Sequence, residues 1–141
     1  MKPPKREYEK VPTDDFVTGV IEDYQYEEEH DFKGPDSKKG PAVRFKFVID
    51  GLQYPKHSSW MTFSYAEKSN LYSKYLVSLV ANAKANMDFD LDQVKGMKVK
   101  MLWKDNPKNP AFQGVDSIRP IGEKISALVT GDAVIEEEIP F

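Results

Sequence analysis

The amino-acid sequence predicts an all-β domain with one main helix. Five segments are rich in β-branched and aromatic residues or alternate apolar with polar residues, which is typical of strands. One segment, residues 71–83, carries apolar residues at helical spacing instead. The predicted order is therefore three strands, one helix and two strands. The chain of 141 residues is long enough for one domain with a substantial core.

Three strands are predicted before the helix. Residues 16–26 form a long strand in which Gly19 suggests a bulge or bend, and residues 27–40 form a polar loop. Residues 42–50 alternate cleanly, which predicts a half-buried strand. Its buried face is apolar and consists of Val43, Phe45, Phe47 and Ile49. Asp50-Gly51 predicts a turn, and a third strand is expected over residues 57–63.

The helix has two candidate starting points. Ser64 with Glu67 forms a capping-box pattern, and Ser69 is a rival N-cap. The apolar stripe of the helix consists of Leu71, Tyr72, Tyr75, Leu76, Leu79, Val80 and Ala83. The helix should end within residues 83–87, and residues 88–96 are predicted to be a connector with room for one more helical turn.

Two strands are predicted after the helix. Residues 97–104 alternate again, residues 105–110 form a loop because their two prolines interrupt a ladder, and residues 112–121 form the fifth strand. Neither end of the chain has a sustained pattern. We therefore expect a flexible N-terminal arm over residues 1–12, a folded domain over 13–121 and a flexible tail over 122–141.

The order of elements resembles the OB-fold, a five-stranded Greek-key barrel with its helix between the third and fourth strands. A bend-prone glycine in a long first strand agrees with this resemblance. The resemblance implies a binding channel across the second and third strands. It would be flanked by the loops that join strands one to two and four to five.

Charge is segregated along the chain, although the formal net charge is only −3. Acids predominate in residues 12–40 and at the C-terminus, and bases outnumber acids in residues 41–121. This arrangement is common in chains that bind a polyanion with one part and a basic partner with another. The absence of cysteine excludes disulfides and thiolate metal sites. With no signal-peptide pattern and no long apolar run, we expect a cytoplasmic protein without a membrane partner.

The chain ends in an acidic run that leads into three apolar residues: Glu136, Glu137, Glu138, Ile139, Pro140 and Phe141. This ending resembles the C-terminal tip of bacterial-type single-stranded DNA-binding proteins, whose DNA-binding part is an OB-fold. The match at the tip covers the seven residues 135–141, and in the barrel the resemblance is one of pattern. It implies a phage-encoded or divergent member that coats single-stranded DNA and recruits replication, recombination and repair proteins. An apolar pocket rimmed by Lys or Arg would receive the tip.

Single-strand binding requires cations along the phosphates and exposed rings on which bases stack. The cationic candidates near the expected channel are Arg44, Lys46, Lys56, His57, Lys104 and Lys108. The aromatic candidates are Trp60, Trp103 and Phe112, with Tyr24 and Tyr26 also considered.

Two of the aromatic predictions have explicit alternatives. Trp60 points outward if Met61 and Phe63 point inward, and the opposite register would place it in the core. Trp103 either closes the barrel or lines the channel.

Catalysis has no positive support in the sequence. The acids fall mostly in loops or runs, the two histidines have no partner at a catalytic spacing, and no phosphate-cradling glycine loop is present. We expect no enzyme activity and no cofactor. The main alternative is an OB-fold interaction module that competes for tail-binding pockets, and a metal-dependent nuclease is a weaker one. Oligomeric state, with a homo-oligomer among the alternatives, and DNA versus RNA preference stay open.

Overall fold

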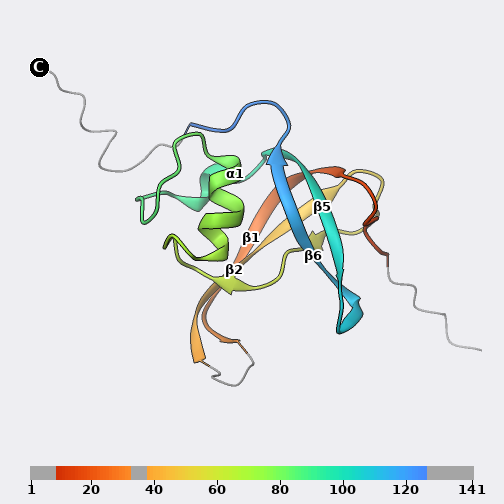
Figure 1. Ribbon diagram of the computed structural model, residues 1–141, viewed down its shortest axis with the longest axis horizontal. Helices are drawn as coiled ribbons and strands as arrows, with labels where there is room; N and C mark the ends of the chain where they lie inside the picture. Colours follow the sequence, from red (N-terminus) through yellow and green to blue (C-terminus); the bar gives the residue numbers. More distant parts are fainter. Residues whose placement is uncertain (1–8, 33–37, 127–141) are drawn as a thin grey trace, which may run out of the picture.

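A computed structural model describes residues 9–32 and 38–126 of the chain (Figure 1). The described residues form mainly one antiparallel sheet with one main helical segment, which agrees with the predicted all-β class. The strands are β1 (Val17–Phe32), β2 (Lys38–Ile49), β3 (Lys56–His57), β4 (Met61–Thr62), β5 (Lys98–Asn106) and β6 (Asn109–Pro120). They lie in the order β3-β2-β1-β5-β6, and β4 also pairs with β2.

The long β1–β2 hairpin corrects two predictions. Residues 27–32 and 38–40 continue the strands instead of forming a loop, so the hairpin extends well beyond the body of the sheet (Figure 1). The register shifts lie between Ile21 and Asp23 and between Glu27 and His30, so Gly19 is not the bulge. A Cβ at Gly19 would lie 2.5 Å from the Val48 carbonyl oxygen. Glycine is therefore required at this position because the β2 backbone approaches closely.

The apolar face of β2 lies in the core, as the alternation predicted. Val43, Phe45, Phe47 and Ile49 are all buried, whereas Val48 on the opposite face is exposed. Gly51, in the predicted turn after this strand, has a φ of +86°, a conformation that favours glycine.

The predicted third strand is divided by Ser58. Its backbone N–H donates to the Phe45 carbonyl, and its Oγ accepts a hydrogen bond from the Phe45 N–H, both at 2.9 Å. The hydroxyl thus takes the place of a backbone acceptor, and the side chain is 3% exposed. The strand therefore breaks into β3 and β4, with Ser58, Ser59 and Trp60 between them.

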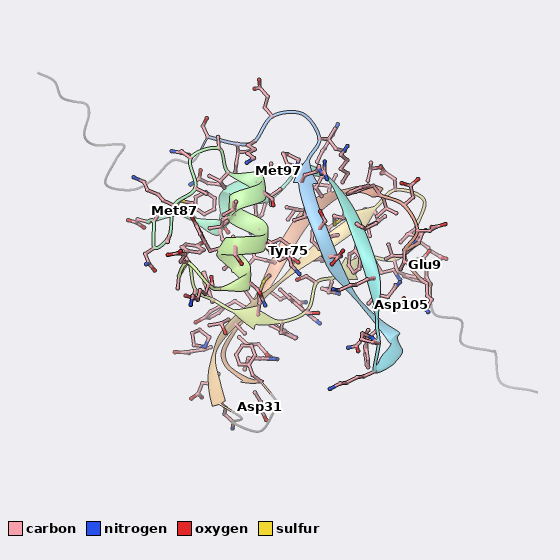
Figure 2. All side chains as sticks on the ribbon, viewed as in Figure 1. Glu9, Asp31, Tyr75, Met87, Met97 and Asp105 are labelled. Atoms are coloured by element: carbon pink, nitrogen blue, oxygen red, sulfur yellow. The ribbon has the colours of Figure 1, made fainter. Side chains whose placement is uncertain are left out.

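The helix is shorter than predicted. A π-type segment, η1 (Leu71–Leu76), continues into α1 (Val77–Leu79), and Ser69 Oγ accepts a hydrogen bond from the Tyr72 N–H. Val80 is extended and forms a parallel bridge with Ile125, which ends the helix before Ala83. Tyr75 lies on the side of the helix that faces the sheet and packs against Phe45, with ring centroids 4.9 Å apart (Figure 2).

The connector and the last two strands lie where they were predicted, but the loop between these strands is shorter. The connector contains a 3₁₀ turn, η2 (Leu91–Val94). β5 reaches Asn106 and β6 begins at Asn109, so the predicted six-residue loop is reduced to a tight hairpin turn. The start of β1 pairs with β5, which joins the two hairpins into one sheet.

Both ends of the predicted domain extend further than expected. Val11 is buried, and its backbone N–H and carbonyl bond to the side-chain amide of Gln113. Ile125 packs against the core and exchanges backbone hydrogen bonds with Leu79 and Ala81. The folded unit therefore includes residues 9–12 of the predicted arm and residues 122–126 of the predicted tail.

Candidate nucleic-acid interface

Trp60 has the orientation that the sequence predicted. Met61 is buried, Phe63 packs against the core and Thr62 is exposed, so the inward positions are odd-numbered. Trp60 consequently lies on the outer side of the sheet, where its side chain is half-buried. The alternative register, with Trp60 in the core, is wrong.

Trp60 lies between groups from both strands of the β1–β2 hairpin. The His30 ring stacks on it with centroids 4.6 Å apart and planes inclined by 25°. The Arg44 guanidinium carbon lies 4.8 Å from the Trp60 ring centroid, and Arg44 Nε donates to Gln25 Oε1 at 2.6 Å. We call Trp60, His30 and Arg44 the Trp60 cluster. It presents an aromatic surface next to a cation, the combination on which bases stack.

His30 was missed at the sequence level because it falls in the segment predicted to be a loop. In the hairpin, the second register shift places His30 opposite Gly40. Its Nδ1 contacts Glu27 Oε1, and Phe32 meets its ring edge-on at 4.7 Å. No local sequence signal identifies this position. The bulge that decides which side of the sheet His30 points to depends on the pairing of β1 with β2.

A groove runs between the segment before β4 and strand β6. One hollow of about 210 Å³ is lined by residues that include Phe112, Lys104 and Ser59. A second hollow of about 150 Å³ shares Ser59, Lys104 and Gly114 with the first and reaches Trp60 and Lys74. We call these two adjoining hollows the β6 groove. It leads from Phe112 to the Trp60 cluster.

Three of the six predicted cations have acidic partners: Lys46, Lys104 and Lys56. Lys46 Nζ lies 2.9 Å from Glu22 Oε1, and Lys104 Nζ lies 3.2 Å from Asp116 Oδ1. The hydrogen bond that Lys46 donates to Glu22 raises the pKa of Lys46, so this lysine stays charged. Exposed pairs of this kind are weak, so a phosphate can replace the carboxylate at little cost.

Three further cationic candidates differ in their surroundings. Arg44 has no carboxylate partner among the described residues, and the Lys108 side chain is exposed. His57 lies opposite Lys46 in the β2–β3 pair. Burial lowers the pKa of His57, and the positive charges of Arg44 and Lys46 lower it further, so the imidazole is neutral at pH 7.

The two aromatic residues of the β5–β6 hairpin have opposite environments. Phe112 is 64% exposed at the mouth of the β6 groove. Trp103 is 2% exposed and meets Phe47 edge-on at 5.9 Å, so it has no free face for a base. The prediction that Trp103 contacts nucleic acid is wrong, because its position on β5 puts it on the core side of the sheet with Met101 and Val99. Its Nε1 has no hydrogen-bond partner within the described part of the chain.

The tyrosines of β1 are placed apart from the Trp60 cluster. The Tyr24 hydroxyl donates to Asp92 Oδ1 at 2.6 Å, and this bond raises the pKa of Tyr24 to about 12. Lys95 Nζ lies 5.0 Å from the Tyr24 ring centroid. Tyr26 is half exposed and meets Phe63 edge-on at 5.6 Å. Both rings thus pack on other parts of the protein.

The predicted partner-binding tip, residues 136–141, lies outside the described residues. Over residues 9–32 and 38–126, no three His, Asp or Glu side chains gather in an arrangement that could hold a metal ion. In the same ranges, no helix has the length and apolar character needed to cross a bilayer. Comparison with known proteins finds no matching family model, no matching curated protein and no matching solved structure.

Proposed function

We propose that this chain is an OB-fold protein that binds single-stranded DNA in the cytoplasm. The strand order supports the fold, because β1 pairs with both β2 and β5 and the helix lies between β4 and β5. The segment before β4 and strand β6 face each other across the β6 groove, as the two edges of a nearly closed barrel do. A Cβ added at Gly114 would lie only 3.5 Å from Ser59 Oγ, so the two edges lie close together at this point.

The Trp60 cluster is the observation that carries the function. A half-buried indole with a guanidinium beside it lies at the end of a groove that begins at the exposed Phe112 ring. Phe112 and Trp60 supply stacking surfaces, and Lys104 and Lys74 line the groove between them. This combination suits a single strand, whose bases are free to stack while its phosphates meet cations.

The proposed mechanism is non-catalytic. A strand would displace carboxylates from the exposed lysine pairs and place its phosphates there, and a base would exchange with His30 or add to the outer surface of the Trp60 cluster. The acidic Ile-Pro-Phe tip would recruit replication, recombination and repair proteins to the coated strand.

A fluorescence titration with oligo(dT) tests the proposal. Trp103 is buried, so quenching on binding would report mainly on Trp60. We expect saturable quenching, far weaker binding of duplex of equal length, and a linear fall of log K with log[salt]. Absence of binding at low salt, or a preference for duplex, would contradict the proposal.

The second candidate is an OB-fold interaction module with little DNA affinity of its own. It is favoured by the acids that pair with the candidate lysines and by the acidic end of the β1–β2 hairpin, where Asp31 lies (Figure 2). This module would compete through the C-terminal tip for pockets that serve another binding protein. It predicts partner capture through the tip together with no quenching by oligo(dT).

A further inference from the structure

The segment that precedes β1 places a carboxylate in a site built for an anion. Glu9 Oε2 accepts from the Gln53 backbone N–H at 2.6 Å, and Glu9 Oε1 accepts from the Tyr54 N–H at 2.9 Å. Lys56 Nζ lies 3.7 Å from Glu9 Oε1 and also bonds to the Glu9 carbonyl. Two successive N–H groups and an ammonium therefore converge on one carboxylate. Such a backbone nest with a lysine beside it suits a phosphate equally well.

This site adjoins the proposed strand path. A hollow of about 190 Å³ is lined by Glu9, Lys56 and His57 and also by Phe112 and Gln113. Phe112 and Gln113 line the β6 groove as well, so the hollow continues the groove past the exposed ring. Glu9 and Asp105 lie on the same side of the molecule, beside the β5–β6 hairpin (Figure 2).

We propose that the Gln53 and Tyr54 N–H groups and Lys56 form a phosphate site for the bound strand, and that Glu9 occupies this site until a strand displaces it. The identity of the phosphate as part of a single strand rests on the proposed function. A base stacked on Phe112 would have its phosphate beside this site. The exchange replaces one anion by another, so neither the N–H groups nor Lys56 is left without a partner.

The surroundings of Glu9 explain why its carboxylate fills the anion site and can still leave it. The N–H groups of Gln53 and Tyr54, and then Lys56, lower the pKa of Glu9, so the carboxylate is charged at pH 7. The nearby Val11 is buried and anchors the segment, whereas Glu9 itself is only partly buried. Loss of the Glu9 contacts therefore does not require the Val11 contacts to break.

Removal of the Glu9 carboxylate should tighten strand binding. In the full-length protein, Glu9→Ala should lower the Kd for oligo(dT) roughly two- to fivefold at low salt, the range expected for release of one exposed ion pair. Because the phosphate occupies the site in both complexes, the slope of log K against log[salt] should differ little between Glu9→Ala and the wild type. Glu67→Ala is the matched control, because it removes an exposed acid with no partner among the described residues. If Glu9→Ala and Glu67→Ala give the same affinity for oligo(dT), the inference is wrong.

Glu9→Gln separates competition from a structural role. Glutamine keeps an oxygen acceptor for the two N–H groups but has no charge. The variant should therefore fold as the wild type does. If Glu9 only fastens the N-terminal segment, Glu9→Gln should bind oligo(dT) as the wild type does, which would overturn the inference. A tighter Kd with an unchanged thermal midpoint supports it.

Inorganic phosphate tests the site without nucleic acid. In Glu9→Ala, phosphate should shift the Gln53 and Tyr54 amide signals in NMR spectra, and it should shift them far less in the wild type or in Glu9→Ala/Lys56→Ala. If phosphate shifts these amides but oligo(dT) does not bind, the anion site stands and the proposed function fails. If oligo(dT) binds the wild type and phosphate leaves the amides of Glu9→Ala unmoved, the function stands and the anion site fails.

Discussion

Replacement of Trp60 by alanine is the most direct test of the proposed interface. The change removes the ring that stacks on His30 at 4.6 Å and faces Arg44 at 4.8 Å. A base stacked on an aromatic side chain contributes about 1–3 kcal/mol, so the Kd for oligo(dT) should rise roughly 5- to 150-fold. The folded state loses one stacked pair, about 0.5–1.5 kcal/mol, and one cation–π contact, about 0.5–1 kcal/mol. We therefore expect a stability loss of about 1–2.5 kcal/mol, which leaves the protein folded.

The assay must not depend on the residue that is removed. Fluorescence anisotropy of a labelled oligo(dT) measures the Kd of each variant, and thermal unfolding measures its stability. Trp60→Phe should recover part of the affinity because a ring is retained. Phe16→Ala is the matched control, since Phe16 is exposed and lies 5.0 Å from the Arg119 guanidinium at the other end of β6. Wild-type affinity in a folded Trp60→Ala would refute the stacking role of Trp60.

Three further predictions concern the fold, the pH response and the tail. Gly19→Ala should lower the free energy of unfolding by about 2 kcal/mol, because the new Cβ would lie 2.5 Å from the Val48 carbonyl oxygen. Gly40→Ala is the control, since no atom lies within 4 Å of its new Cβ. It should have little effect in the same denaturant titration. The His57 pKa lies below 6.5 in the folded state, so the unfolded chain binds this proton at a higher pH than the folded protein does. The free energy of unfolding should therefore fall as the pH drops from 6.5 through the lowered pKa. His57→Gln should remove this part of the pH dependence of unfolding. Deletion of residues 136–141 should abolish capture of genome-maintenance proteins in a pull-down. Phe141→Ala should cause most of the same loss, because it removes an anchor of about 2 kcal/mol. DNA binding by the truncated protein should stay unchanged or tighten at low salt. Identical partner lists for the full-length and truncated forms would count against a recruiting role for the tip.

Local sequence pattern was sufficient for the order of elements and for the inward faces of the strands. The alternation of residues 42–50 predicted the buried face of β2 correctly, because a strand that covers a core must bury every second side chain. The same period predicted the outward position of Trp60 from the inward positions of Met61 and Phe63. The helical spacing after Ser69 predicted the position of the helix, although not its end.

Features that depend on pairing between distant residues were decided only by the tertiary structure. The polar segment 27–32 became strand because β2 supplies its hydrogen-bond partners, and the register shift after Glu27 then brought His30 onto Trp60. The helix ended at Leu79 because Val80 pairs with Ile125, far along the chain.

The same distinction applies to the site. The residue types for strand binding were visible in the sequence, since cations and rings can be counted there. Their partners were not, because Glu22, Asp116 and Glu9 reach Lys46, Lys104 and Lys56 only after the strands are assembled. Sequence by itself therefore determined the order of elements and the chemistry available. The tertiary structure decided which rings are free and which cations are already paired, because both depend on contacts between residues far apart in the chain.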